Sequence, residues 1–255
     1  MTSKKKIFLS ILLLSLLTPN ISQAMHIMEG FLPAKWAFIW AIVSLPFVFI
    51  GLKRLKQIFR GDANQKVLLG LAGAFVFVLS ALKIPSVTGS CSHPTGMGLG
   101  SILFGPITMT IVGLVVLLFQ ALLLAHGGLT TLGANTFSMA IVGPLVSYGI
   151  FKLLKKKDGS TTFAVFLAAL RRRLWGHWRA PVRHRAMNGP GTAIQLSLAF
   201  PDPVTGFIGS LGKFLSVFAV TQIPLAIVEG IITAVVYNLL AEYSKEGVIR
   251  IETIK

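Results

Sequence analysis

Long apolar segments, separated by polar or basic stretches, dominate the chain. Five of them lie near residues 34–53, 66–83, 100–124, 134–154 and 212–240. A helix needs about 20 consecutive apolar residues to cross the hydrocarbon core of a bilayer. Each segment is therefore predicted to contain a transmembrane helix, and the predicted fold class is an all-α integral membrane protein.

A shorter apolar run at the start of the chain has a different character. Three lysines precede it, it extends from Ile7 to Leu17, and the small residue Ala24 follows after a polar stretch. A basic start, a short apolar core and a small residue before the cut are typical of a secretory signal peptide. We predict a signal peptide over residues 1–24 and a single membrane-embedded domain over residues 25–255, with Met25 as the new N-terminus.

The positions of the basic residues predict how the chain crosses the membrane, because loops rich in lysine and arginine stay on the cytoplasmic side. A cleaved signal peptide leaves Met25 outside, the first span brings the basic residues of 54–65 inside, and the second puts the polar loop around His93 outside. Single crossings at the next two segments would place Lys155–Lys157 outside, against this rule. We therefore expect two short or broken crossings in the glycine-rich region 98–135, and about seven transmembrane helices in the mature chain.

The composition agrees with a multi-pass protein of the cytoplasmic cell membrane. The 255 residues are 54% hydrophobic and 13% charged, whereas soluble domains carry about 25% charged residues. The formal net charge of +16 does not indicate a nucleic-acid partner, because basic residues beside membrane spans account for much of it. The single cysteine, Cys91, excludes an internal disulfide.

Residues 171–191 do not fit this pattern. They carry six arginines, two histidines and no acidic residue, with apolar sequence on both sides. At about 2.5–3.5 kcal/mol per central arginine, a lipid-facing span would cost roughly 15–20 kcal/mol. The alternatives are a basic cytoplasmic loop near anionic lipid, a nucleic-acid arm, or a local reading-frame slip between about Leu170 and Thr192. We favour the slip, because arginine, glycine, proline, tryptophan and histidine together are typical of GC-rich DNA read out of frame.

The predicted new N-terminus has metal-binding chemistry. The α-amino nitrogen of Met25, the amide nitrogen of His26 and the His26 imidazole can form fused chelate rings around one ion. Amine and imidazole nitrogens suit nickel, copper, zinc or cobalt. The alternative is that an arbitrary pair of residues follows the signal peptide.

Four motifs, in order along the chain, resemble those of the CbiM family. They are Met-His-Ile-Met-Glu-Gly-Phe-Leu-Pro at 25–33, Ser-Cys-Ser-His-Pro-Thr-Gly at 90–96, Gly-Ala-Asn-Thr-Phe-Ser-Met at 133–139 and Ala-Phe-Pro-Asp-Pro-Val-Thr-Gly-Phe at 199–207. CbiM proteins are the substrate-capture subunits of energy-coupling factor cobalt transporters, and the closely similar NikM subunits carry nickel. The resemblance breaks down at 171–191, where the family has a membrane helix.

The resemblance implies a metal site made by Met25, His26 and His93. The ligands would be the N-terminal amine, the backbone nitrogen and imidazole of the second residue, and the imidazole of His93. The ion, Co²⁺ or alternatively Ni²⁺, would be the transported substrate, and no organic cofactor is expected.

The resemblance also implies a subunit that is not an enzyme and that imports cobalt for cobalamin biosynthesis. Its expected partners are a coupling subunit like CbiQ, an ATPase like CbiO, a small accessory subunit like CbiN and the lipid bilayer. An intramembrane metal enzyme and a passive channel are the alternatives from other classes. The chain has no His-Glu-x-x-His pattern and few acidic residues, which disfavours both.

Three polar residues are candidates for a supporting shell around the metal site. Glu29 could accept a hydrogen bond from a ligand, but a loop carboxylate that satisfies backbone donors is the favoured interpretation. Asn135 and Thr136 could orient the His93 loop or cap the next helix.

Three further polar residues have other expected roles. His126 is interpreted as a helix-end histidine rather than a ligand. Asp202, between two prolines, could cap the following helix, and Glu229 could pair with a helix of a partner subunit.

Overall fold

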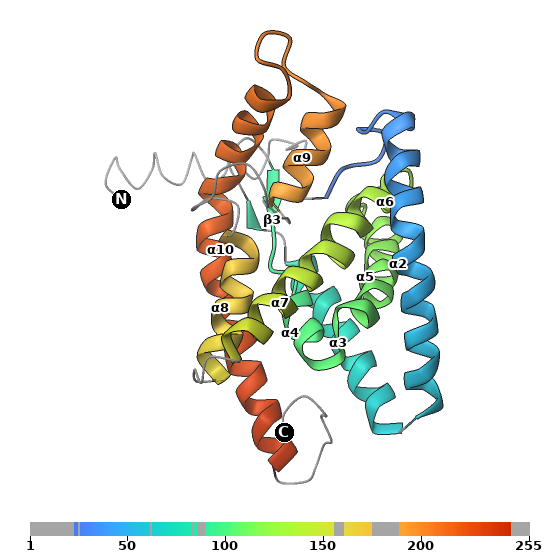
Figure 1. Ribbon diagram of the computed structural model, residues 1–255, viewed down its shortest axis with the longest axis vertical. Helices are drawn as coiled ribbons and strands as arrows, with labels where there is room; N and C mark the ends of the chain where they lie inside the picture. Colours follow the sequence, from blue (N-terminus) through green and yellow to red (C-terminus); the bar gives the residue numbers. More distant parts are fainter. Residues whose placement is uncertain are drawn as a thin grey trace, which may run out of the picture.

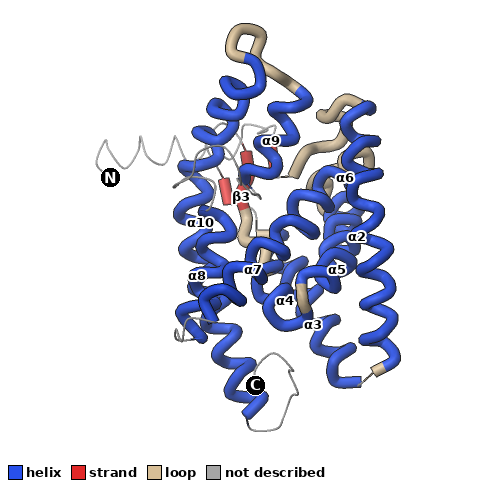
Figure 2. The backbone as a smooth tube through the Cα atoms, viewed as in Figure 1, coloured by secondary structure: helices blue, strands red, loops and turns tan. Residues whose placement is uncertain are grey.

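A computed structural model gives the fold of the chain (Figure 1). It describes residues 23–24, 26–61, 63–82, 84–85, 90–155, 161–174 and 189–245. Figure 2 shows helices almost throughout these residues, with three very short strands. Met25, nearly all of the predicted signal peptide and the central part of 171–191 lie outside the described residues, so the interpretations of these segments stay predictions.

Five helical segments among the described residues are long and apolar enough to cross a membrane. They are α2 (Ala34–Arg60), α3 (Ala63–Ala81), α5 (Pro106–Leu123), the run Leu132–Lys155 and, within α10 (Gly206–Lys245), Pro224–Ser244. They match the five predicted segments, which confirms an all-helical, multi-pass membrane fold. Helix α2 continues well beyond residue 53, because its lysines and arginines are good helix formers outside the apolar core.

The predicted segment 100–124 is divided between two helices. The short helix α4 (Met97–Phe104) ends at Gly105, which has a φ of 82°, and Pro106 begins α5. Glycine adopts this left-handed conformation without a steric penalty, and proline is favoured at the first helical position. With eight residues, α4 is about 12 Å long, and Gly105 separates it from α5.

The run from Leu132 to Lys155 changes its winding part-way along. It begins as α6 (Leu132–Asn135), continues as the π-helix η2 (Thr136–Val142) and ends as α7 (Gly143–Lys155). In the wider turns, the amide of Gly143 donates to the carbonyl of Ser138, five residues earlier. Such π-helical turns are rare and are frequently found at functional sites.

The remaining helices and the small sheet complete the bundle. Helix α10 runs along one edge against α8 (Thr161–Leu174) and α9 (Gly189–Ala199), and α2 runs along the opposite edge (Figure 1). Strand β3 (Ser90–Ser92) pairs in parallel with β1 (Gln23–Ala24) and antiparallel with β2 (Ile84–Pro85). The backbone just before Met25 therefore lies beside the loop that leads to His93.

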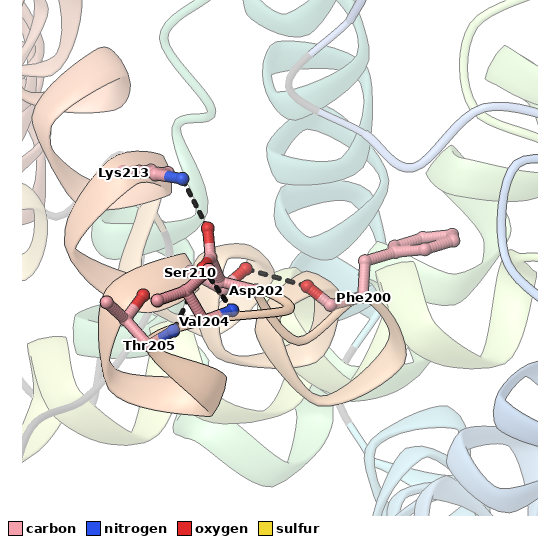
Figure 3. Close-up of polar contacts among 6 residues, drawn as sticks. All are labelled: Phe200, Asp202, Val204, Thr205, Ser210 and Lys213. Atoms are coloured by element: carbon pink, nitrogen blue, oxygen red, sulfur yellow. Dashed lines mark hydrogen bonds and ion pairs between the residues drawn. The ribbon is translucent and has the colours of Figure 1, made fainter.

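Asp202 organises the turn between α9 and α10 (Figure 3). One carboxylate oxygen accepts the amides of Val204 and Thr205, each at 3.0 Å, and the other pairs with Lys213. The Lys213 ammonium, followed by the two amides, holds the pKa of Asp202 well below its usual range. Both amides precede α10, which begins at Gly206, so Asp202 shapes the turn before this helix and does not cap its first turn as the sequence led us to expect.

Gly133 lies at a very close approach between two helices, and its replacement should destabilise the fold. A Cβ atom added there would lie 2.5 Å from Cα of Ala41 in α2, and Ser44 already donates to the Gly133 carbonyl at 3.0 Å. We expect Gly133→Ala to lower the stability by about 1–3 kcal/mol, as overpacking does. Thermal unfolding in detergent would measure this.

The matched control is Gly149→Ala in α7, where an added Cβ would meet nothing within 4 Å. Equal melting temperatures for the two variants would contradict the proposed close packing of α6 on α2.

Candidate metal centre

Three buried histidines meet inside the bundle. His26, His93 and His126 are 1%, 0% and 3% exposed, and one ring nitrogen of each lies within 4.8 Å of the others. Each comes from a different loop: before α2, between β3 and α4, and between α5 and α6. Residues 100 positions apart are thus combined in one cluster, which we call the histidine cluster.

The spacing of the ring nitrogens suits ligands of a single ion. Nε2 of His93 lies 3.4 Å from Nδ1 of His26 and 3.1 Å from Nε2 of His126. With metal–imidazole bonds of about 2.0–2.1 Å, as in zinc sites, two ligands are about 2.9 Å apart at a right angle and about 3.3 Å apart in a tetrahedron. One metal ion could therefore bind all three rings with small adjustments.

The orientation of His26 is relevant to the predicted chelate. Nδ1, and not Nε2, is its nitrogen nearest to His93. Nδ1 is also the nitrogen that can close a six-membered ring with the metal and the amide nitrogen of the same residue. The ring therefore faces the cluster in the way that a chelate by the backbone and imidazole of His26 requires.

Asn135 and Thr131 hold the loop that carries His26. The Asn135 side chain accepts the Ile27 amide at 2.8 Å and donates to the Ile27 carbonyl at 3.0 Å. The Thr131 hydroxyl donates to the same carbonyl at 2.6 Å. Asn135 therefore positions the residue next to His26; these bonds go to the Ile27 backbone and not to the His93 loop.

Thr136 has a different environment from Asn135. It is 1% exposed and begins η2. Within the described part of the chain, its hydroxyl oxygen has no hydrogen-bond partner. The hydroxyl of Thr136 therefore makes no hydrogen bond to the histidine cluster or to the described residues of the His93 loop.

Glu29 joins the first loop to the third at the surface. Its two carboxylate oxygens accept the Thr130 amide at 3.2 and 3.3 Å, and the Gly30 amide donates to the Thr130 hydroxyl at 3.2 Å. Hydrogen bonding from Thr130 lowers the pKa of Glu29. The residue thus lies where a loop carboxylate satisfying a backbone donor would lie, outside the histidine cluster.

The end of α5 positions His126. Ala125 adopts a left-handed φ of 46°, and the amides of Leu124 and His126 both donate to the Gln120 carbonyl at 3.1 Å. Left-handed residues commonly end helices in this way. The chain then continues through Gly127, where an added Cβ would lie 3.3 Å from Cβ of His26.

The sequence alone favours a helix-end role for His126, and the residue does follow a helix end. The structure adds that this end lies at the histidine cluster. The available signal was the pair Gly127-Gly128 directly after a histidine, since paired glycines allow a backbone to approach closely.

Hydrogen bonds on both sides fix the His93 loop. Nδ1 of His93 lies 3.1 Å from the Pro94 carbonyl oxygen. The Thr95 hydroxyl and the Gly96 amide donate to Oε1 of Glu229 at 2.8 and 3.1 Å. Glu229 is 1% exposed, so this carboxylate pairs inside the chain. The expectation that it would pair with a helix of a partner subunit is therefore wrong.

Comparison with known proteins identifies the family. The family model described as "Cobalt uptake substrate-specific transmembrane region", CbiM, matches residues 26–247. The chain belongs to the CbiM family. This confirms the resemblance seen in the four motifs, and it confirms a substrate-specific membrane component of cobalt uptake rather than an enzyme.

Curated relatives in the CbiM family are similar over nearly the whole chain. "Cobalt transport protein CbiM" of Acetoanaerobium sticklandii is 58% identical over 248 residues, which cover 97% of each chain. The protein of the same name from Thermosipho melanesiensis is 59% identical over 234 residues, covering 92% of this chain and 94% of the relative.

Solved structures share the fold. A truncated transition metal transporter is 25% identical with a TM-score of 0.71, over 86% of this chain and 99% of its own. A second transition metal transporter, 24% identical, gives a TM-score of 0.73 over 88% of this chain and 95% of its own.

Replacing Asn135 should weaken metal binding without removing any ligand. Asn135→Ala leaves the buried Ile27 amide without its acceptor. The loop that carries His26 then loses both hydrogen bonds that hold it to the Asn135 side chain. A buried group left unsatisfied costs about 1–3 kcal/mol, so we expect cobalt affinity to fall about tenfold, measured by titration of purified protein.

Asn238→Ala is the matched control, because Asn238 is an exposed residue of α10 that pairs with Thr162. If Asn135→Ala bound cobalt as tightly as this control, the two hydrogen bonds between Asn135 and the Ile27 backbone would not position His26.

Proposed function

We propose that the mature chain captures a divalent cobalt ion at the histidine cluster, on the outer side of the membrane, for import by a larger complex. One observation carries this proposal: three buried imidazoles of a CbiM-family chain converge with their nitrogens within 4.8 Å of one another. Imidazole nitrogens suit cobalt and nickel, whereas magnesium and calcium prefer oxygen ligands. Nickel is the alternative substrate.

The proposed ligands are the Met25 amine, the amide nitrogen and Nδ1 of His26, and Nε2 of His93, with His126 as a third imidazole. The orientation of His26 supports the chelate, because Nδ1 faces His93. The His26 amide must lose its proton when the ion binds. Binding therefore releases protons and should weaken as the pH falls.

The proposed topology has seven crossings after removal of the signal peptide, with Met25 outside. Because His93 precedes α4 and His126 follows α5, the pair α4–α5 leads the chain away from the histidine cluster and back. In this topology α4 and α5 are two crossings in place of the single one that hydropathy suggests, and the charge distribution requires this additional crossing. Helix α7 then ends on the opposite side, where Lys152 and Lys155 belong on the cytoplasmic face.

The proposed complex includes a transmembrane coupling subunit, an ATPase and a small accessory subunit, like CbiQ, CbiO and CbiN. The chain has no phosphate-binding G-x-x-x-x-G-K-[ST] loop, so another subunit must supply the ATP-driven step. The imported cobalt would serve cobalamin biosynthesis.

A free amine at Met25 should be essential for cobalt binding. We compare the purified mature protein, with its N-terminus sequenced, and a variant that keeps one extra residue before Met25. The extra residue turns the α-amine into an amide, which, unlike an amine, must lose a further proton before it can bind the ion, so cobalt binding should be lost near neutral pH. Equal affinities would place the site elsewhere.

His126 should influence the choice between cobalt and nickel. A planar set of nitrogens favours tetragonal ions such as nickel(II) and copper(II), and a third imidazole outside that plane would disfavour them. His126→Ala should therefore weaken cobalt binding more than nickel binding, and should change the visible absorption of bound cobalt(II).

His93→Ala is the control for the His126 variant, because it should abolish the binding of both metals. An unchanged ratio of cobalt to nickel affinity in His126→Ala would exclude His126 as a selective ligand.

A further inference from the structure

Glu229 links the longest helix to the loop of a metal ligand. It lies in α10, at 1% exposure, and its Oε1 atom accepts the Thr95 hydroxyl at 2.8 Å and the Gly96 amide at 3.1 Å. Thr95 is two residues beyond His93. An acidic side chain within a membrane span is energetically expensive and is a candidate for a functional role.

The surroundings of Glu229 explain how it can be buried. Gly96 precedes α4 as its N-cap and has no side chain to bond the amides of the first turn. Helix N-termini leave amide groups unpaired and favour negative charge. Glu229 therefore accepts, from 133 residues away, the amide of the N-cap residue, which in a capping box bonds to a glutamate in the first turn of the helix.

The loop also has little room to move on its opposite side. Gly96 has a left-handed φ of 66°, and an added Cβ would lie 2.9 Å from the ring of Phe75 in α3. Pro94 further restricts the backbone next to His93. The loop is thus held between α3 and the carboxylate of α10, so a displacement of Glu229 must displace the residues attached to His93.

We propose that Glu229 is a positioning residue for the metal site, and that it couples the occupancy of the site to the packing of α10. This inference rests on the proposed function. If α10 positions His93 for the ion, then the ion bound to His93 stabilises that position of α10 by the same free energy, because coupling is reciprocal. The metal site thereby acts on a helix that packs against α8 and α9 at the edge of the bundle.

The test compares the full chain with Glu229→Leu, Glu229→Gln and Thr95→Val, by cobalt titration and by the absorption spectrum of bound cobalt(II). Glu229→Leu removes both bonds, and we expect about tenfold weaker binding and an altered spectrum. Both bonds end on Oε1, which the glutamine side chain retains, so Glu229→Gln should stay within about threefold of the wild type. Thr95→Val removes one bond without touching α10 and should give an intermediate loss.

Hydrogen exchange of α10 tests the coupling itself. Cobalt should slow exchange of the α10 amides around Glu229 in the wild type and in Glu229→Gln, to an intermediate extent in Thr95→Val, and much less in Glu229→Leu. Equal exchange with and without cobalt in the wild type would overturn the coupling. Glu242→Gln, an exposed acid of the same helix, is the control and should behave as the wild type.

Wild-type affinity and spectrum in Glu229→Leu would overturn the positioning role; if that variant does not fold, the same result for Thr95→Val would do so. A loss in Glu229→Gln equal to that in Glu229→Leu would also overturn it, since charge and not the two hydrogen bonds would then matter. His93→Ala separates the two proposals: wild-type cobalt binding in that variant would overturn the proposed function, whatever the Glu229 variants show.

Discussion

The side-chain amide of Asn135 fixes the loop on which the histidine cluster depends. The loop before α2 has no regular secondary structure around Ile27, yet this residue is buried at 3% exposure, and its backbone groups need partners. One asparagine supplies both, with its oxygen at 2.8 Å and its nitrogen at 3.0 Å. An aspartate of similar shape would supply only acceptors when ionised. The amide thus allows an irregular segment to enter the bundle with His26 beside it.

Irregular backbone within the bundle of a membrane protein is tolerated where protein surrounds it. Here three loops surround one another. Glu29 bonds to Thr130, and Gly128 lies so close to the first loop that an added Cβ would be 2.5 Å from Cα of Glu29. The remaining loop carries His93 and is bonded to Glu229 through Thr95 and Gly96. Each loop is therefore part of the environment that makes the others possible, and the helices mainly set the distance between them.

Local sequence patterns predicted the positions of the helices better than the contacts between residues that are far apart in the sequence. Hydropathy located the membrane-spanning helices, and the parity of charged loops indicated the break that the structure places at Gly105. The motifs pointed to His26 and His93. The position of His126 in the histidine cluster and the hydrogen bonds of Glu229 inside the chain were not predicted, because each depends on residues that are far away in the sequence: Glu229 is 134 positions from Thr95. Periodicity and spacing carry no information about such pairs, whereas a fold brings them within hydrogen-bonding distance.

The π-helical turns of η2 determine how α7, which follows them, is rotated about its own axis. Asn135 lies just before these turns and faces the first loop, whereas Ile150 and Phe151 of α7 are buried against the other half of the bundle. A single residue rotates an α-helix by about 100°. Deleting one residue from η2 to restore regular α-helix would thus leave Asn135 in place and rotate the buried face of α7 by about 100° away from α4 and α8. The length of this short segment, more than its composition, keeps the two halves of the molecule in register.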